Sequence, residues 1–204
     1  MVYDLLILGG GPGGYTAAER AGNAGLKIAL FEKDTLGGVC LNEGCIPTKT
    51  MLNSAKIYNH ANNSEIFAVT SADVSFNQAQ VVKRKNKVVK ILVGGVKAKM
   101  KNSGVEVIKA DASLHGKEGA LFRVDACNET YLGKNLLIAT GSTPTIPPIS
   151  GLKEGLESGF VVTNKEILDL EEIPERLTVI GGGVIGLEMA SYFQTIGSRV
   201  TVIE

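Results

Sequence analysis

The chain has 204 residues, with 21 basic and 21 acidic side chains and therefore no formal net charge. This balance argues against a surface for nucleic acid or for an anionic membrane. No apolar run reaches the roughly 18 residues of a membrane span, and no leader with a cleavage site precedes the first predicted strand. We therefore expect a cytoplasmic protein with one large or two small domains.

The first 32 residues predict a strand, a glycine-rich turn, a helix and a second strand. Val2–Leu8 is a short apolar run, typical of a buried parallel strand, and it leads into Gly-Gly-Gly-Pro-Gly-Gly at residues 9–14. A helix is expected from about Tyr15 to Ala24 and a strand over Lys27–Phe31, followed by Glu32. Glycines at a helix N-terminus let the backbone approach a pyrophosphate, and an acid about 20 residues on accepts ribose hydroxyls. This order of elements predicts a dinucleotide site.

Residues 37–50 carry two of the three cysteines, Cys40 and Cys45. A close thiol pair in a cysteine-poor chain indicates redox chemistry or metal binding. Metal binding is the weaker alternative, because no nearby His or further Cys completes a set of four ligands. A disulfide requires Cα atoms about 4.4–6.8 Å apart, whereas five steps along a regular helix rise about 7.5 Å. The chain must therefore bend between the two cysteines, and the glycines around them allow this.

Pro47 predicts the start of a helix that runs to about Asn62. We expect Pro47 at its first position, Ile46 as the cap and Cys45 just before it, where the positive helix end favours a thiolate. Lys49 is then a cation in the first turn, where the helix dipole disfavours it, which hints at a functional role. A solvated lysine whose stem covers apolar surface is the alternative.

The middle of the chain predicts one long helix and three strands. The helix covers Asn77–Lys101 and is rich in lysine, which favours a solvated surface over an acidic partner. Gly94-Gly95 interrupts it, so a kink or a close contact is expected there. The strands are expected at Val105–Ala110, Leu121–Ala126 and Asn135–Ala139. Cys127 follows the second of them and is interpreted as a buried bystander.

Prolines 144, 147 and 148 indicate a domain boundary near residues 145–155, and a second nucleotide signature follows it. A short helix is expected at residues 164–170, a strand at 177–180, a glycine turn at 181–186, a helix at 187–196 and a strand at 199–203. Gly181 and Glu204 both lie 172 positions after their counterparts, Gly9 and Glu32. Two complete signatures predict two nucleotide cofactors, and a thiol pair beside them indicates electron transfer.

These motifs resemble, over the whole length of the chain, those of the flavin-dependent pyridine nucleotide–disulfide oxidoreductases. The motifs that carry the resemblance are GGGPGG with Glu32, GGVCLNEGCIPTK, ATGSTP, and GGGVIGLEMA with Glu204. Within the family they are most similar to the branch that oxidises dihydrolipoamide. The resemblance implies an α/β fold with two Rossmann-like FAD- and NAD-binding domains of the three-layer ββα type. It implies an FAD-binding domain at residues 1–148 and an incomplete NAD-binding domain at residues 149–204.

The resemblance also assigns the site residues. It implies that Cys40 exchanges with the dithiol substrate, that Cys45 lies against the flavin, and that Lys49 sits at the flavin and pairs with Glu188. The implied FAD-binding residues are Gly9, Gly11, Pro12, Gly13, Gly14, Glu32, Lys33, Gly38, Lys49, Ala112, Ala139, Thr140, Gly141 and Ser142. The implied NAD-binding residues are Gly181, Gly183, Val184, Ile185, Gly186, Glu188 and Glu204. An acid at Glu204 favours NAD over NADP, because it repels a 2′-phosphate.

In such enzymes electrons run from dihydrolipoamide, free or on a lipoyl-bearing protein domain, through the Cys40–Cys45 disulfide to FAD and then to NAD⁺. Family members continue past this length into a C-terminal interface domain that supplies a His–Glu base and most of a homodimer contact. His60 and His115 lie outside any motif, so the chain is interpreted as an N-terminal fragment, inactive alone. The alternatives are a glutathione- or mercury-reducing relative and a non-catalytic FAD-binding module.

Overall fold

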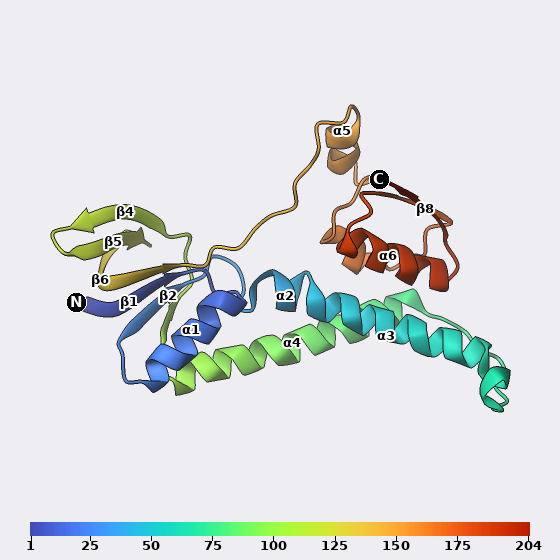
Figure 1. Cartoon of the computed structure of the whole chain (residues 1–204), viewed down its shortest axis with the longest axis horizontal. Helices are drawn as coiled ribbons and strands as arrows, with labels where there is room; N and C mark the ends of the chain where they lie inside the picture. Colours follow the sequence, from blue (N-terminus) through green and yellow to red (C-terminus); the bar gives the residue numbers. More distant parts are fainter. The chain divides into compact units, whose positions relative to one another are not determined.

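The computed structural model describes all residues, 1–204, and they form two compact units. The first unit comprises Met1–Asn42 and Lys90–Thr143, and the second comprises Glu43–Val89 and Pro144–Glu204 (Figure 1). None of the helices has the length and the apolar character needed to cross a membrane.

The first unit is built on a six-stranded sheet with the order β3-β2-β1-β6-β5-β4 (Figure 1). Its strands are β1 (Val2–Leu8), β2 (Ile28–Phe31), β3 (Glu106–Ile108), β4 (Ser113–Glu118), β5 (Leu121–Ala126) and β6 (Glu129–Ile138). The pairs β1–β2, β1–β6 and β2–β3 are parallel, while β4–β5 and β5–β6 are antiparallel. β1 lies inside the sheet, which explains its nearly continuous apolar sequence.

Helices α1 (Pro12–Asn23) and α2 (Gly38–Asn42) belong to this unit, together with the second half of α4 (Gln78–Asn102). One core cluster of the unit contains Leu6, Ala29, Phe31 and Val124, each almost fully buried. Tyr131 packs edge-on against Phe31, with the ring centroids 5.0 Å apart. The predicted α/β fold is therefore confirmed, with a sheet that is parallel from β3 to β6 and antiparallel at β5 and β4.

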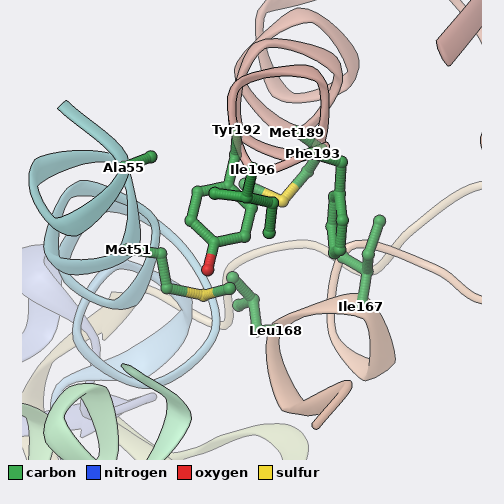
Figure 2. Packing of buried hydrophobic residues seen from close by; sticks show 8 residues of the cluster. All are labelled: Met51, Ala55, Ile167, Leu168, Met189, Tyr192, Phe193 and Ile196. Atoms are coloured by element: carbon green, nitrogen blue, oxygen red, sulfur yellow. The ribbon is translucent and has the colours of Figure 1, made fainter. Parts of the chain in front are cut away.

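The second unit contains a parallel strand pair and the helices around it. Its elements are α3 (Cys45–Asn62), η1 (Ser64–Phe67), the first half of α4, α5 (Leu152–Glu157), η2 (Glu166–Asp169), β7 (Arg176–Ile180), α6 (Val184–Thr195) and β8 (Arg199–Ile203). Figure 2 shows its core, in which α3, η2 and α6 contribute side chains to one cluster. The members are Met51, Ala55, Ile167, Leu168, Met189, Tyr192, Phe193 and Ile196.

A buried polar chain stabilises the same core. The Tyr192 hydroxyl donates a hydrogen bond to Gln78 Oε1 at 2.5 Å, and Gln78 Nε2 donates to the Leu170 carbonyl at 2.7 Å. Lys85, which is almost fully buried, pairs with Asp169 at 2.5 Å. Each of these buried groups has a partner, and the hydrogen bonds and the ion pair offset part of the cost of removing the groups from water. They link the start of α4 to η2 and α6.

Several sequence expectations need correction. α1 and α6 begin three residues earlier than predicted, because the last residues of each glycine-rich motif are already helical. β4 and α5 were not predicted at all. α4 continues through Gly94-Gly95 from residue 78 to 102, so the expected interruption is wrong.

The expectation that Cys127 is buried is also wrong. Cys127 is exposed, and it forms the two-residue turn between β5 and β6 with Asn128. Both residues have positive φ, 52° and 62°, as the tight turn of a twisted hairpin requires. A turn of this kind points away from the sheet, so the apolar character of the preceding strand does not extend to Cys127.

The predicted division into domains at residues 148 and 149 stays a prediction. It concerns which residues bind each nucleotide, whereas the compact units describe how the chain is packed. Residues 43–89 were assigned to the first domain but pack within the second unit.

Candidate functional site

The first candidate site lies where three parallel strands of the first unit end. Leu8 at the end of β1 is in register with Phe31 of β2 and with Ile138 of β6. Parallel strands in register end at one edge of the sheet, and ligands of open α/β sheets bind outside that carboxyl edge. The segments that start at Gly9, Glu32 and Ala139 therefore leave the sheet side by side.

The glycine turn 9–14 makes a close connection from β1 to α1. Gly9 has a φ of 99°, and its N–H donates to the Phe31 carbonyl at 2.8 Å. A Cβ on Gly14 would collide with the Gly9 carbonyl oxygen, so only glycine fits there. Gly11 is the N-cap of α1 and Pro12 its first residue, and no side chain caps this helix end. The N–H groups of the first turn are thus available to an anion.

The Glu32 carboxylate connects the segment that follows β1 with the segment that follows β2. One carboxylate oxygen accepts the Gly10 N–H at 2.8 Å, and the other accepts the Asp34 N–H at 2.8 Å. Two backbone donors hold the carboxylate beside the glycine turn, where it can still accept hydroxyl groups. A Cβ at Gly11 or Gly13 would meet its nearest heavy atom only at 3.6 or 3.8 Å, so the turn keeps room around these two residues. A free helix end, an open turn and a fixed acid fit the adenosine and pyrophosphate parts of FAD.

A second turn, formed by Leu36, Gly37 and Gly38, packs on the first. Gly37 donates its N–H to the Gly10 carbonyl at 2.9 Å, and Gly37 and Gly38 have φ angles of 106° and 56°. A Cβ on Gly38 would come within 2.6 Å of the Gly11 Cα. Gly38 therefore lies directly against the start of α1.

The other predicted FAD-binding residues surround the same edge of the sheet. The Ala139 N–H donates to the Leu8 carbonyl at 2.8 Å, and a Cβ on Gly9 would strike the Ala139 carbonyl, so β6 ends against the glycine turn. Thr140, Gly141 and Ser142 continue from it and are exposed. Lys33 is exposed after Glu32, and Ala112 is half-buried between β3 and β4. Their contacts with a flavin stay a prediction.

The second candidate site repeats the first in backbone detail. Gly181 has a φ of 105° and donates its N–H to the Ile203 carbonyl at 2.8 Å, as Gly9 does to Phe31. The Gly182 N–H donates to Glu204, as that of Gly10 does to Glu32. Gly183 caps α6 in the same extended conformation as Gly11, and a Cβ on Gly186 would collide with the Gly181 carbonyl.

The loop 181–186 also leaves room for a ligand. A Cβ on Gly181 or Gly183 would meet nothing within 4 Å, and Val184 and Ile185 are exposed. An uncapped helix end beside a carboxylate suits a second adenine nucleotide. The residues present thus fit NAD at this loop.

Gly10 and Gly182, whose N–H groups bind the two acids, are not among the residues predicted from the sequence. The dinucleotide fingerprint names the other glycines of the turn. The signal was nevertheless available, because each turn begins with three consecutive glycines and the N–H of the middle one binds the acid.

The two cysteines lie on consecutive helices. Cys40 is in the middle of the five-residue α2, and Cys45 is the first residue of α3, with Gly44 as its N-cap. α3 begins two residues earlier than predicted, which places Pro47 third rather than first. Proline is tolerated there because the first-turn N–H groups have no acceptor within the helix. Cys45 is exposed at the positive end of an 18-residue helix.

Lys49 and Glu188 lie on helices that pack together in the second unit. Met51 and Ala55 of α3 contact Met189 and Tyr192 of α6 in the core cluster (Figure 2). Lys49 is exposed and Glu188 half-buried. No ion pair joins them, and their predicted pairing stays a prediction.

The histidines lie where a surface role was expected. The ring of His60 packs beside Phe67 with centroids 5.5 Å apart, and His115 Nε2 lies 3.5 Å from Asp125 Oδ2 on the hairpin of β4 and β5. The chain holds no group of three or more His, Cys, Asp or Glu side chains arranged to bind a metal ion.

Comparison with known proteins agrees with this description. The model of the family described as pyridine nucleotide-disulphide oxidoreductase matches residues 3–204. A dihydrolipoyl dehydrogenase of Acholeplasma laidlawii is 45% identical over 203 residues, which cover 99% of this chain and 59% of the relative. A dihydrolipoyl dehydrogenase of Bacillus subtilis is 41% identical, with 99% of this chain and 44% of the relative covered.

A solved structure extends the likeness to three dimensions. The Cu(II) complex of the HOCl-induced flavoprotein disulfide reductase RclA from Escherichia coli superposes with a TM-score of 0.81 at 29% identity. The match covers 98% of this chain and 41% of that one. The chain thus spans about half the length of the proteins that it matches.

Proposed function

This chain belongs to the pyridine nucleotide-disulphide oxidoreductase family, and we propose that the whole protein is a dihydrolipoamide dehydrogenase that uses FAD and NAD. The observation that carries the proposal is the pair of equivalent nucleotide loops, at Gly9–Gly14 and Gly181–Gly186, in a chain that also has the Cys40–Cys45 pair. Relatives at 40–45% identity that are named for dihydrolipoyl or dihydrolipoamide oxidation support the choice of substrate.

We assign FAD to the first loop and NAD to the second. The first-turn N–H groups of α1 would hold the FAD pyrophosphate, and Glu32 would accept its ribose hydroxyls. The start of α6 and Glu204 would hold NAD in the same way. FAD, when bound, supplies two-electron redox chemistry between a dithiol and a nicotinamide.

The cysteines would perform the exchange with the substrate. Cys40 and Cys45 are both thiols in this structure, and in the oxidised protein they would be joined as a disulfide. One thiolate of dihydrolipoamide would then attack Cys40 Sγ, the Cys40–Cys45 bond would break, and Cys45 would leave as a thiolate. The second substrate thiol loses its proton to a base and displaces Cys40 from the mixed disulfide. The substrate leaves as its cyclic disulfide, and the cysteine pair has gained two electrons. The N-terminal end of α3, which carries the positive end of the helix dipole, would stabilise the negative charge on Cys45.

The rest of the proposal concerns the whole protein. We propose that the whole protein has a base that accepts the substrate proton, forms a homodimer and is cytoplasmic. Its substrate is either free dihydrolipoamide or a lipoyl-bearing domain. Lys49 and Glu188 are assigned to the flavin side of the site, on the packed helices α3 and α6.

The experiment compares two reactions of the purified full-length protein. We expect NAD⁺ reduction with dihydrolipoamide, followed at 340 nm, and negligible NADPH oxidation with glutathione disulfide or mercuric ion. Cys40→Ser and Cys45→Ser should each reduce the rate to background, whereas Cys127→Ser should keep it, because Cys127 is exposed on the hairpin turn between β5 and β6 and lies outside the cysteine motif. Activity confined to the NADPH reactions would replace this proposal with a disulfide reductase, the class to which RclA belongs.

A further inference from the structure

The side chain of Asn42 binds three backbone carbonyls at once. Its Nδ2 lies 2.9 Å from the Gly38 oxygen, 3.3 Å from that of Leu36 and 3.5 Å from that of Thr35. Asn42 is the last residue of α2, two positions after Cys40. One carboxamide group thus ties the end of this short helix back to the turn that precedes it.

That turn is part of the nucleotide site. Gly37 donates to the Gly10 carbonyl, and Gly38 lies against the Cα of Gly11 at the start of α1. Leu36 is buried, and its Cδ2 would be 2.6 Å from a Cβ on Gly10. The turn is therefore held on one side by the glycine loop and on the other by the Asn42 carboxamide.

We propose that Asn42 is a positioning residue that sets the place of α2, and hence of Cys40, against the nucleotide loop. This inference rests on the proposed function. α2 has only five residues, too few to hold its own conformation in water, so contacts outside the helix must define where it begins. The three carbonyls that Asn42 binds belong to residues 35, 36 and 38, which lead into α2. Moving them would displace Gly38 from Gly11 and Cys40 with it.

The chemistry requires an amide at this position. A carboxamide nitrogen carries two N–H donors and faces only acceptors here. An aspartate has nearly the same shape but would direct a carboxylate at three carbonyl oxygens, so it replaces attraction with repulsion. Protonation would give that aspartic acid one donor, and part of the bonding would return.

The test uses the full-length protein with Asn42→Asp, and with Asn42→Ser as a milder variant. Asn135→Ala is the matched control, because Asn135 Nδ2 makes one bond, to the Asp4 carbonyl at 3.0 Å, on an exposed part of the same sheet. We expect Asn42→Asp to raise the dissociation constant of FAD about tenfold and to slow the reduction of bound flavin by dihydrolipoamide about tenfold. Reduction of the same flavin by dithionite, which needs no cysteine, should keep the wild-type rate.

The pH dependence separates positioning from a general loss of stability. Relative to wild type at each pH, Asn42→Asp should recover FAD affinity as the pH falls from 8 towards 5, and Asn42→Ser should not. Circular dichroism shows which variants are folded. If Asn42→Asp does not fold, the test rests on Asn42→Ser, for which we expect an intermediate effect on FAD affinity and on flavin reduction. A folded variant with wild-type FAD affinity and wild-type flavin reduction would overturn the proposal. If dihydrolipoamide fails to reduce the wild-type flavin, the proposed function is wrong, while the FAD affinities still decide the role of Asn42.

Discussion

At the residue scale, three tyrosines have hydroxyl groups that are unfavourable to ionise in the folded protein. Tyr3 is buried and donates to Glu106 at 2.7 Å, and burial together with this carboxylate raises its pKa to about 12. Tyr131 donates to Glu129 at 2.8 Å, and this bond, with burial, raises its pKa to about 12. Burial also raises the pKa of Tyr192. In the unfolded chain all three ionise near pH 10.

The protein should therefore lose stability in alkali. A raised pKa in the folded state means that the unfolded chain releases its protons first, so the contribution to stability is complete below about pH 10 and decreases between about pH 10 and 12. Urea unfolding at pH 8, 10, 11 and 12 measures this decrease. Tyr3→Phe should flatten the decrease, although it lowers stability at pH 8 by removing the bond to Glu106. An unchanged slope in this variant would contradict the assignment to Tyr3.

At the element scale, α4 shows that a glycine pair does not necessarily break a helix. It is helical over 25 residues and buries Val82, Val93, Val96 and Met100 on one face. Gly94 and Gly95 are exposed, and a Cβ on either would meet nothing within 4 Å. The burial of the apolar face outweighs the roughly 1 kcal/mol that each glycine costs.

Alanine at these two positions should stabilise the protein. Gly94→Ala and Gly95→Ala should each raise the free energy of unfolding by about 0.5–1 kcal/mol, since alanine restricts the unfolded chain and fits the helix. Thermal unfolding would register this as an increase of about 1–4 °C. Gly22→Ala in α1 is the matched control and should destabilise, because its Cβ would strike the Ser103 carbonyl. Destabilisation by Gly94→Ala would contradict this prediction and would indicate that another chain lies against Gly94.

At the scale of the whole molecule, two copies of one nucleotide-binding arrangement are distributed over two compact units. Gly9–Glu32 belongs to the first unit and Gly181–Glu204 to the second. In both, the acid is bound by the N–H of the middle glycine of the first three. Each unit therefore contains one glycine turn together with the acid that it binds.

The two sites should respond separately to mutation. In the full-length protein, Glu32→Gln should raise the dissociation constant of FAD about tenfold, since a charged acceptor for the ribose hydroxyls is lost. Glu204→Gln should raise the KM for NAD⁺ to a similar extent and lessen the discrimination against NADP⁺. Flavin fluorescence and steady-state kinetics measure the two effects, and each variant is the control for the other. Loss of both cofactors from either variant would contradict the assignment.

Much of the fold could be read from local sequence. β1, β5, β7 and β8 were predicted within one residue, because short apolar runs bounded by glycine or polar residues have one stable conformation in an α/β protein. β4 was missed because all of its residues are exposed, so it has no apolar alternation. Cys127 was misplaced because the turn that exposes it depends on positive φ angles at two residues that are not glycine.

By itself, the sequence determined the two glycine turns, the acids that follow them and the position of the cysteine pair, since all of these depend on residue types at short, regular spacings. Only the tertiary structure showed which groups hold them in place. Gly38 against Gly11 joins two segments that are well separated in the sequence, while the Asn42 carboxamide closes the short turn before Cys40 in a way that no residue pattern announces. Hydrogen bonds and steric contacts of this kind depend on where the chain returns in space, and that is decided by the packing of the whole sheet and its helices.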